Sequence, residues 1–178
     1  TNKIAEGELM QLANKNNLNT SLQQLKKISY YKTGRLFEAS AKSAAMLSGK
    51  SIPFIENISK AAKLIGIAFQ VRDDLLDYGV SKGNIGKPEM QDILEDKITY
   101  PLYFALKYSN KKDSSKILKK LKNKDFSIEE VADFVSSSNA FNKCNSLIQN
   151  YSNEISKCIN QISNKEIRDE MLNLSESL

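Results

Sequence analysis

The chain has 178 residues, which is enough for one domain with a sizeable core and too few to make two ordinary domains. Only 7 glycines and 3 prolines occur, tryptophan is absent, and the abundance of Lys, Leu, Ile, Ser, Asn, Ala and Glu favours helix over sheet. The net charge is +5, but the lysines are spread along the chain, often beside acids, which gives little support to nucleic-acid binding. These properties predict a single all-α domain spanning residues 1–178.

Two cysteines, Cys144 and Cys158, fall in a segment that is predicted to be one helix. At about 1.5 Å per residue they are roughly 21 Å apart, so they cannot form a disulfide with each other. With no CxxC motif and no histidine, zinc sites and histidine general bases are excluded, and reduced thiols in the cytoplasm are the simplest interpretation. The longest apolar run, Leu64–Phe69, is far shorter than the roughly 18 residues of a membrane span, and we see no signal peptide, so we expect no membrane insertion.

Helical patterns follow one another from the start of the chain. The first lies over Ile4–Lys15, and because the sequence starts inside this pattern without an initiator methionine, we expect preceding residues to be missing from it. Thr20 or Ser21 is a candidate N-cap for a long helix that ends near Ser48. The predicted apolar stripe of this helix consists of Leu22, Leu25, Ile28, Leu36, Phe37 and Met46.

The most apolar segment begins at Pro53 and continues to about Tyr78, which predicts a central and largely buried helix. The next segment, Gly79–Asp92, contains three glycines and a proline, and is predicted to be a surface loop. In the lysine-rich run Lys111–Lys124, apolar residues recur at helical spacing, which indicates a solvated helix face in preference to a phosphate-binding surface. Further helices are predicted over Thr99–Tyr108, Asp113–Lys122, Ser127–Ser137, Phe141–Ile162 and Lys165–Leu174.

Three carboxylates lie close together in the apolar helix that is predicted from Pro53 to about Tyr78. Asp73 and Asp77 are four residues apart, so they project from one helical face about 6 Å from each other, with Asp74 alongside. Hard oxygen ligands without histidine or thiolate point to Mg²⁺. The alternative is an exposed helix turn in which the carboxylates pair with Arg72 and nearby lysines. The pair Gly86-Lys87 in the following loop favours the metal site, because a cation there could contact a metal-bound diphosphate.

The segment Phe69–Asp77, with the sequence FQVRDDLLD, resembles the second aspartate-rich motif FQxxDDxxD of the trans-isoprenyl diphosphate synthases, also called polyprenyl synthetases. The similarity continues on both sides of this motif, in the family's order and spacing. Upstream, Lys32-Thr33 matches the family's Lys-Thr pair, and Glu6, Gly7 and Gln11 resemble the segment before it. Downstream, the matching residues are Gly86-Lys87, Asp92, Lys97, Thr99 and Pro101.

The resemblance implies an isoprenoid synthase-like helical bundle, of which this chain is the C-terminal part. It implies an enzyme that condenses an allylic diphosphate with isopentenyl diphosphate, in which metal ions and lysines stabilise the leaving diphosphate and no protein nucleophile is needed. The implied Mg²⁺ ligands are Asp73 and Asp77, with Asp74 assisting. Contacts to the diphosphate are implied for Lys32, Lys87 and Lys97. Thr33 and Gln70 would lie beside the leaving oxygen and the developing allylic cation.

Some features of the family are not found in this sequence. No second DDxxD motif is present, and the upstream basic residues that hold isopentenyl diphosphate are also absent. Met90 and Asp96 stand where the family usually has glycine, and Met90 is expected to alter the loop backbone.

Several questions of function stay open at the level of sequence. The wording of the motifs is closest to bacterial farnesyl diphosphate synthase (geranyltranstransferase), so farnesyl diphosphate is the expected product. The alternatives are a long-chain polyprenyl diphosphate synthase and a non-catalytic helical subunit or fragment that needs a complete partner. The family resemblance also implies a homodimer.

Overall fold

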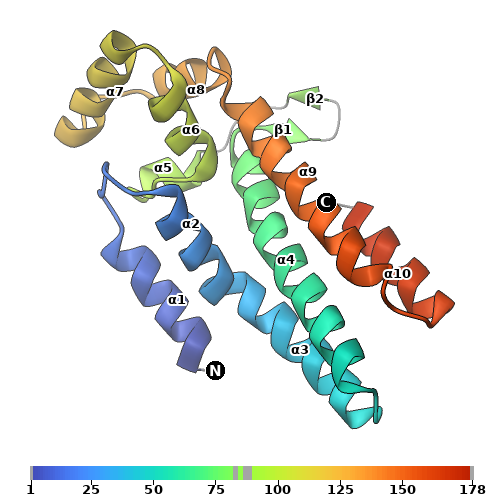
Figure 1. The fold of residues 1–178 in the computed structure, drawn as a ribbon. Coiled ribbons are helices and arrows are strands. Elements are labelled where there is room, and N and C mark those ends of the chain that lie inside the picture. Colours follow the sequence, from blue (N-terminus) through green and yellow to red (C-terminus); the bar gives the residue numbers. More distant parts are fainter. Residues whose placement is uncertain (1, 82–83, 86–89, 177–178) are drawn as a thin grey trace. The chain divides into compact units, whose positions relative to one another are not determined.

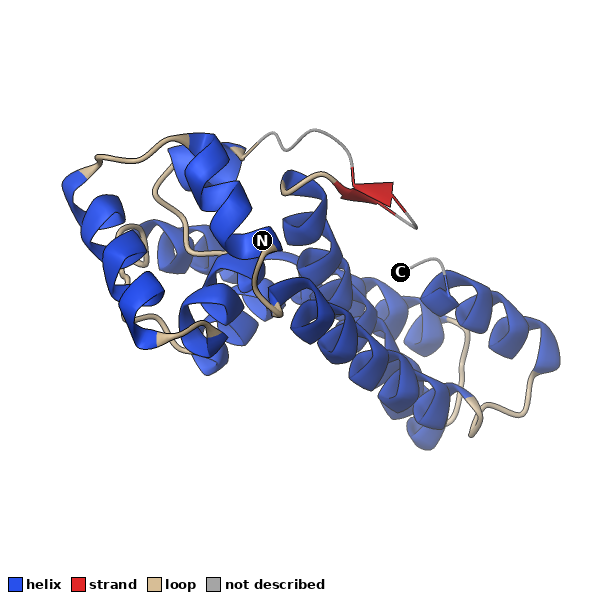
Figure 2. Ribbon diagram, turned by 90° about the horizontal axis from the view of Figure 1, so that it is seen from above, coloured by secondary structure: helices blue, strands red, loops and turns tan. Residues whose placement is uncertain are grey.

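The computed structural model describes residues 2–81, 84–85 and 90–176. The described residues are almost entirely helical, which confirms the predicted all-α class (Figures 1 and 2). The strands among them form a short antiparallel hairpin, in which Val80 of β1 (Val80–Ser81) pairs with Ile85 of β2 (Asn84–Ile85). It falls within the segment predicted as a loop.

The helices follow the predicted order along the chain. The first predicted helix is observed as α1 and the long second one as α2, a single π-helical turn η1, and α3, while α5 was not predicted. Ser21 is confirmed as a cap, since its hydroxyl oxygen accepts a hydrogen bond from the Gln24 N–H at 3.1 Å. The bounds are α1 Asn2–Ala13, α2 Leu22–Ser29, η1 Tyr30–Gly34, α3 Arg35–Leu47, α4 Ile52–Asp77, α5 Gln91–Leu94, α6 Tyr100–Tyr108, α7 Lys111–Asn123, α8 Ile128–Ser136, α9 Ala140–Ile159 and α10 Lys165–Glu176.

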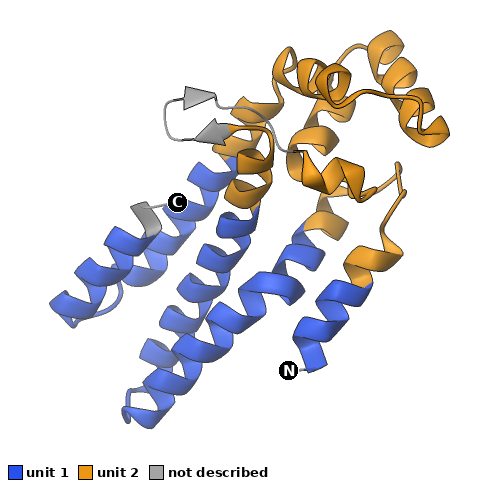
Figure 3. Cartoon of the chain, turned by 180° about the vertical axis from the view of Figure 1, so that it is seen from behind, with its two compact units in different colours: residues 1–9, 26–70, 147–178 blue, residues 10–25, 71–146 orange. Residues whose placement is uncertain are grey.

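The chain divides into two compact units, and α4 and α9 each contribute residues to both of them (Figure 3). Unit 1 consists of residues 1–9, 26–70 and 147–178, and unit 2 consists of residues 10–25 and 71–146. Within α4, the boundary lies between Gln70 and Val71. The residues of the FQxxDDxxD motif are therefore divided between the two units.

Unit 1 is built from long helices that pack through small residues. A side chain at Gly66 of α4 would place its Cβ 2.7 Å from the Cα of Gly34, and one at Gly7 of α1 would lie 2.5 Å from the backbone nitrogen of Lys32. Such distances leave no room for a methyl group, so α1 and α4 each approach η1 closely at these glycines. Unit 1 also contains a small core cluster of Ala45, Ile58 and Ile162.

Unit 2 packs short helices around buried aromatic and aliphatic side chains, including Tyr100 and Leu102 of α6 and Val131 of α8. On α7, Ile117 and Leu121 are buried while the lysines of the run are mostly exposed, as expected for a solvated helix face. Local caps begin these helices. At α7 the Asn110 side chain accepts the Asp113 N–H, and at α8 the Ser127 hydroxyl accepts the Glu130 N–H.

Two expectations about burial had different outcomes. α4 is largely buried as predicted, with Ala61, Ala68 and Val71 at 0% exposure. The predicted apolar stripe is wrong at two positions of α3, because Leu36 is 54% exposed and Met46 is 58% exposed. Helical periodicity identifies one face of a helix, but it does not say whether another element covers that face.

Both cysteines are free and buried. No described helix is long and apolar enough to cross a membrane.

Candidate functional site

The predicted Lys-Thr pair lies in the π-helical turn η1 of unit 1. Single π-helical turns widen a helix locally and occur often at functional sites. Here the Thr33 hydroxyl donates a hydrogen bond to the side-chain oxygen of Gln70 at 3.1 Å, and both side chains are partly buried. Thr33 and Gln70, which sequence resemblance placed at the same reacting centre, are therefore in direct contact. Lys32 precedes this pair in the same turn and is half-buried.

A second set of polar contacts fixes the start of η1. The Tyr30 hydroxyl donates to the Glu38 carboxylate at 2.8 Å, and the Arg35 guanidinium donates to both, at 2.7 Å to Tyr30 and 2.9 Å to Glu38. Burial and the Glu38 hydrogen bond raise the pKa of Tyr30, so its hydroxyl remains a donor. The Lys63 ammonium lies 4.5 Å from the centre of the Tyr30 ring. These contacts restrain the turn that carries Lys32 and Thr33.

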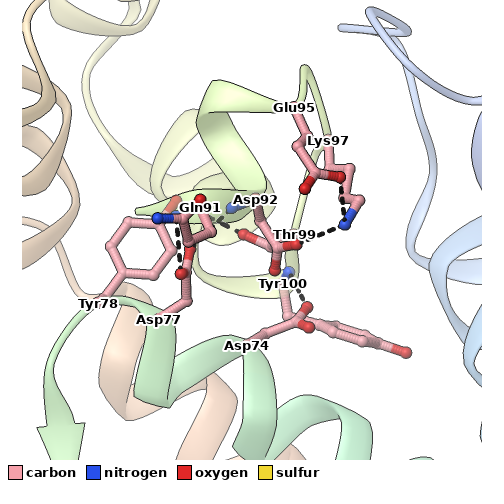
Figure 4. A network of polar contacts seen from close by, with 9 residues as sticks. All are labelled: Asp74, Asp77, Tyr78, Gln91, Asp92, Glu95, Lys97, Thr99 and Tyr100. Carbon is pink, nitrogen blue, oxygen red and sulfur yellow. Dashed lines mark hydrogen bonds and ion pairs between the residues drawn. The ribbon is translucent and has the colours of Figure 1, made fainter. Parts of the chain in front are cut away.

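The three aspartates of the motif have different surroundings in unit 2, and Figure 4 shows those of Asp74 and Asp77. Asp73 is exposed, Asp77 is half-buried, and Asp74 is buried at 6% exposure. The Asp74 carboxylate accepts the backbone N–H of Tyr100 at 3.0 Å. Asp77 accepts two backbone N–H groups, from Gln91 at 2.9 Å and from Asp92 at 3.3 Å. The three carboxylates thus differ in both burial and hydrogen bonding.

Lys97 lies in the same network. Its ammonium contacts the Asp92 carboxylate at 2.9 Å and the Glu95 carboxylate at 3.0 Å, and its side chain is 19% exposed. Burial alone would lower the pKa of Lys97, but the hydrogen bonds to Asp92 and Glu95 outweigh burial and raise it. Lys97 is therefore a fully charged ammonium at neutral pH. Since Asp92 contacts both Asp77 and Lys97, a carboxylate of the motif and this cation are linked through one residue.

Tyr78 and Thr99 complete the buried part of the network. The Thr99 hydroxyl donates to the Tyr78 hydroxyl at 3.5 Å, and both residues are buried. Burial raises the pKa of Tyr78 far above its ordinary value, so the phenol stays protonated. The sequence motif includes Thr99 but gives no indication of its partner.

Asp73 and Asp77 are residues that could hold a metal ion. Both offer carboxylate oxygens, which Mg²⁺ prefers, and Mg²⁺ commonly uses only one or two protein carboxylates and completes its shell with water and phosphate oxygens. Over the described part of the chain, no three Asp, Glu, Cys or His side chains converge on one point. Gly86 and Lys87 lie outside the described residues.

The two positions at which this chain departs from the family pattern share a backbone conformation. Met90 has φ 54° and Asp96 has φ 61°, both in the left-handed region that favours glycine. The side chain of Met90 is fully buried, and the Asp96 carboxylate accepts a hydrogen bond from the Lys124 ammonium at 2.8 Å. The conformation expected of glycine is therefore kept, and tertiary contacts hold these larger side chains in it.

Comparison with known proteins shows the family of this chain. The polyprenyl synthetase family model matches residues 1–138, and the chain belongs to this family. An octaprenyl diphosphate synthase from Haemophilus influenzae is 36% identical over 117 residues, which cover 66% of this chain and 36% of that protein. A probable mitochondrial hexaprenyl pyrophosphate synthase from Yarrowia lipolytica is 30% identical over a match that covers 97% of this chain and 39% of that protein.

Solved structures show the same fold. A decaprenyl diphosphate synthase from Rhodobacter capsulatus superposes with a TM-score of 0.88 at 23% identity, covering 98% of this chain and 55% of that one. A polyprenyl synthase from Caulobacter crescentus, in complex with calcium and isoprenyl diphosphate, superposes with a TM-score of 0.87 at 25% identity, covering 98% and 54%. The chain thus spans less than two fifths of these curated relatives and just over half of these solved chains.

Sequence reasoning missed several residues of this network. Glu95 was not singled out, because it belongs to no recognised motif and its contact with Lys97 depends on the turn at the end of α5. Tyr78 was counted only as the end of an apolar helix. The backbone N–H groups of Gln91 and Tyr100 could not be anticipated, since backbone groups leave no trace in a sequence pattern.

Proposed function

We propose that this chain forms the diphosphate-binding part of a trans-prenyl diphosphate synthase that extends an allylic diphosphate with isopentenyl diphosphate. The observation that carries the proposal is the network around Asp92, which joins Asp77 to Lys97 within unit 2. The Asp77 carboxylate, which suits Mg²⁺, is thereby connected through Asp92 to the Lys97 ammonium, which suits a phosphate oxygen. This combination serves a magnesium-bound diphosphate better than either group alone.

In this proposal Asp73 and Asp77 hold the metal, and Lys32, Lys87 and Lys97 contact the diphosphate. When bound, Mg²⁺ neutralises part of the charge of the diphosphate and so makes it a better leaving group. The contact between Thr33 and Gln70 orients both side chains, so that their polar atoms can stabilise charge at the leaving oxygen and at the allylic cation. The calcium and isoprenyl diphosphate bound to the Caulobacter crescentus protein support this substrate class.

The product of the complete enzyme is proposed to be a long-chain prenyl diphosphate. The farnesyl product expected from the motif wording is not specifically supported by the named relatives, which include octaprenyl and hexaprenyl synthases, and the structural neighbours include a decaprenyl synthase. Long-chain synthesis was one of the alternatives that the sequence left open. The length of the product is a separate question from the chemistry of the site, because each extension repeats the same step.

Catalysis is proposed to require a further helical segment that carries the first aspartate-rich motif. The solved relatives are nearly twice as long as this chain, and several apolar side chains of unit 1 are exposed, including Phe69 at 49% and Leu36 at 54%. Apolar side chains exposed at this level on long helices are suited to contact with further helices. We also propose that the complete protein forms a homodimer, as the family resemblance implies.

The test is the magnesium dependence of diphosphate binding. We would titrate farnesyl diphosphate into the chain with and without Mg²⁺, and repeat both titrations with Asp73→Asn and with Asp133→Asn, an exposed aspartate of α8 that serves as the control. The proposal predicts binding that needs Mg²⁺, a loss of about tenfold or more in affinity for Asp73→Asn, and no change for Asp133→Asn. Equal binding with and without Mg²⁺, or equal behaviour of the two variants, would refute it.

Product length needs a second measurement. The chain would be combined with a polypeptide that supplies the first aspartate-rich motif, and the products formed from farnesyl and isopentenyl diphosphates would be measured by mass spectrometry. Products of more than five isoprene units would support the long-chain assignment. A single product with one added unit would refute that assignment without affecting the binding result.

A further inference from the structure

Asp74 differs from the other two aspartates of the motif because it is buried and faces a helix start. Its carboxylate accepts the N–H of Tyr100, the first residue of α6, although the two residues are 26 positions apart in the chain (Figure 4). Its exposed fraction is only 6%. A carboxylate in that position stabilises the positive end of the helix dipole as well as the N–H group itself.

The start of α6 needs this distant partner, because its own cap is engaged elsewhere. Thr99 occupies the N-cap position with an extended backbone, but its side chain makes no capping hydrogen bond and instead donates to the Tyr78 hydroxyl. Pro101, the second residue of the helix, has no N–H to satisfy. The Tyr100 N–H is therefore the first donor of the helix, and Asp74 satisfies it.

Asp77 makes the corresponding contacts on the other side of Lys97. It accepts the N–H groups of Gln91 and Asp92, which begin α5. At that start, Met90 is in the left-handed conformation and offers no side-chain cap. Two carboxylates that leave α4 one turn apart thus hold the chain before and after Lys97.

We infer that Asp74 is a positioning residue: it anchors the start of α6 to α4, so that Lys97 and Thr99 are held beside the metal-binding carboxylates, and it does not itself bind the metal. The effect on diphosphate binding rests on the proposed function, whereas the effect on the fold does not. Within the motif, Asp73 is thus an exposed carboxylate, and Asp74 is a buried carboxylate with a structural role. Asp77 makes backbone bonds and retains lone pairs for a metal.

Two substitutions of Asp74 separate positioning from metal binding. Asparagine keeps a side-chain oxygen that can accept the Tyr100 N–H, but it is a much poorer Mg²⁺ ligand than a carboxylate. Alanine removes the acceptor and leaves a buried N–H without a partner. If Asp74 positions α6, Asp74→Asn should keep the thermal stability and the diphosphate affinity that Asp74→Ala loses. If Asp74 binds the metal, both variants should lose Mg²⁺-dependent diphosphate binding, as is expected of Asp73→Asn.

The experiment compares Asp74→Asn, Asp74→Ala and Asp73→Asn in thermal unfolding and in farnesyl diphosphate binding with Mg²⁺. We expect Asp74→Ala to lower the Tm by about 4–8 °C and to weaken binding at least about tenfold, since the loop that carries Lys97 is released. We expect Asp74→Asn to stay within about threefold of the original affinity, and Asp73→Asn to keep its Tm while losing binding. A loss of binding by Asp74→Asn at unchanged Tm would overturn the inference.

Hydrogen exchange tests the inference without any ligand. The amides of Tyr100 to Tyr103 should lose protection in Asp74→Ala and keep it in Asp74→Asn, with the exchange of α8 unchanged in both as an internal control. Equal protection in the original chain and in Asp74→Ala would refute the anchoring role, even if Asp74→Ala failed to bind diphosphate. If the original chain binds no diphosphate while the exchange result holds, the proposed function fails and the anchoring role of Asp74 stands.

Discussion

Unit 1 and unit 2 are stabilised internally by different kinds of contact. In unit 1, long helices approach each other at glycines, and the Cβ of a larger residue at Gly66 or Gly7 would meet backbone atoms within 2.7 Å. In unit 2, the carboxylates of Asp74 and Asp77 accept hydrogen bonds from distant backbone N–H groups at the starts of α5 and α6. Close contacts at glycines are thus a feature of unit 1, and hydrogen bonds between carboxylates and helix starts are a feature of unit 2.

The difference suits the proposed chemistry. A close-packed pair of helices can hold Thr33 against Gln70 with little freedom, because backbone positions at a glycine contact are fixed by sterics. The polar network of unit 2 has lone pairs and N–H groups that can also serve a charged ligand. Steric changes should therefore be most damaging in unit 1, and changes of hydrogen-bonding groups in unit 2.

The largest effect is expected at Gly66. Gly66→Ala would place a methyl group 2.7 Å from the Cα of Gly34, and because both atoms belong to backbone, one helix must move. We expect a loss of about 3 kcal/mol in the free energy of unfolding, measured by urea denaturation. Gly49→Ala is the matched control, since that site has open space but a φ of +62°, and should lose only about 1 kcal/mol. Equal losses at the two glycines would contradict the steric explanation.

An intermediate effect is expected at the two left-handed residues of unit 2. Met90→Gly relieves an unfavourable φ but removes a fully buried side chain, so we expect a net loss of about 2 kcal/mol in the same denaturation experiment. Asp96→Gly relieves a similar φ and removes polar contacts of a partly exposed side chain, the ion pair with Lys124 and a hydrogen bond with Asn16, so its change should lie within about 0.5 kcal/mol of zero. A stabilising Met90→Gly would show that strain, rather than burial, dominates at that position.

The smallest effect concerns the pH dependence of the pair between Asp96 and Lys124. The hydrogen bond from Lys124 lowers the pKa of Asp96, so the charged pair contributes stability above the ordinary aspartate pKa of about 3.9, and this contribution is lost as the pH falls through the lowered value. We therefore expect the original chain to exceed Asp96→Asn by about 1 °C in Tm near pH 6, and the difference to vanish near pH 2. A difference that persists at pH 2 would assign the effect to packing.

Much of the helical architecture was predictable from sequence, because the signals are local. The apolar periodicity of α4 predicted its burial, and Ser21, one of two N-cap candidates, was identified from its residue type and place. The π-helical turn η1 was not predicted, since a single widened turn hardly disturbs the spacing of apolar residues. The exposure of Leu36 and Met46 was also missed, because burial depends on neighbours that the helix itself does not specify.

The features of the candidate site were likewise predictable from the sequence only in part. The sequence by itself determined that Gln70, Asp73, Asp74 and Asp77 share one helix and that Lys97 and Thr99 follow, because order and spacing are properties of the chain. Only the tertiary structure decided that Asp74 is buried against the Tyr100 N–H, that Asp77 holds the start of α5, and that Lys97 lies between two carboxylates. The physical reason is that these partners are backbone groups and residues from distant positions, and hydrogen bonds of this kind form only once the folded chain brings them within about 3 Å.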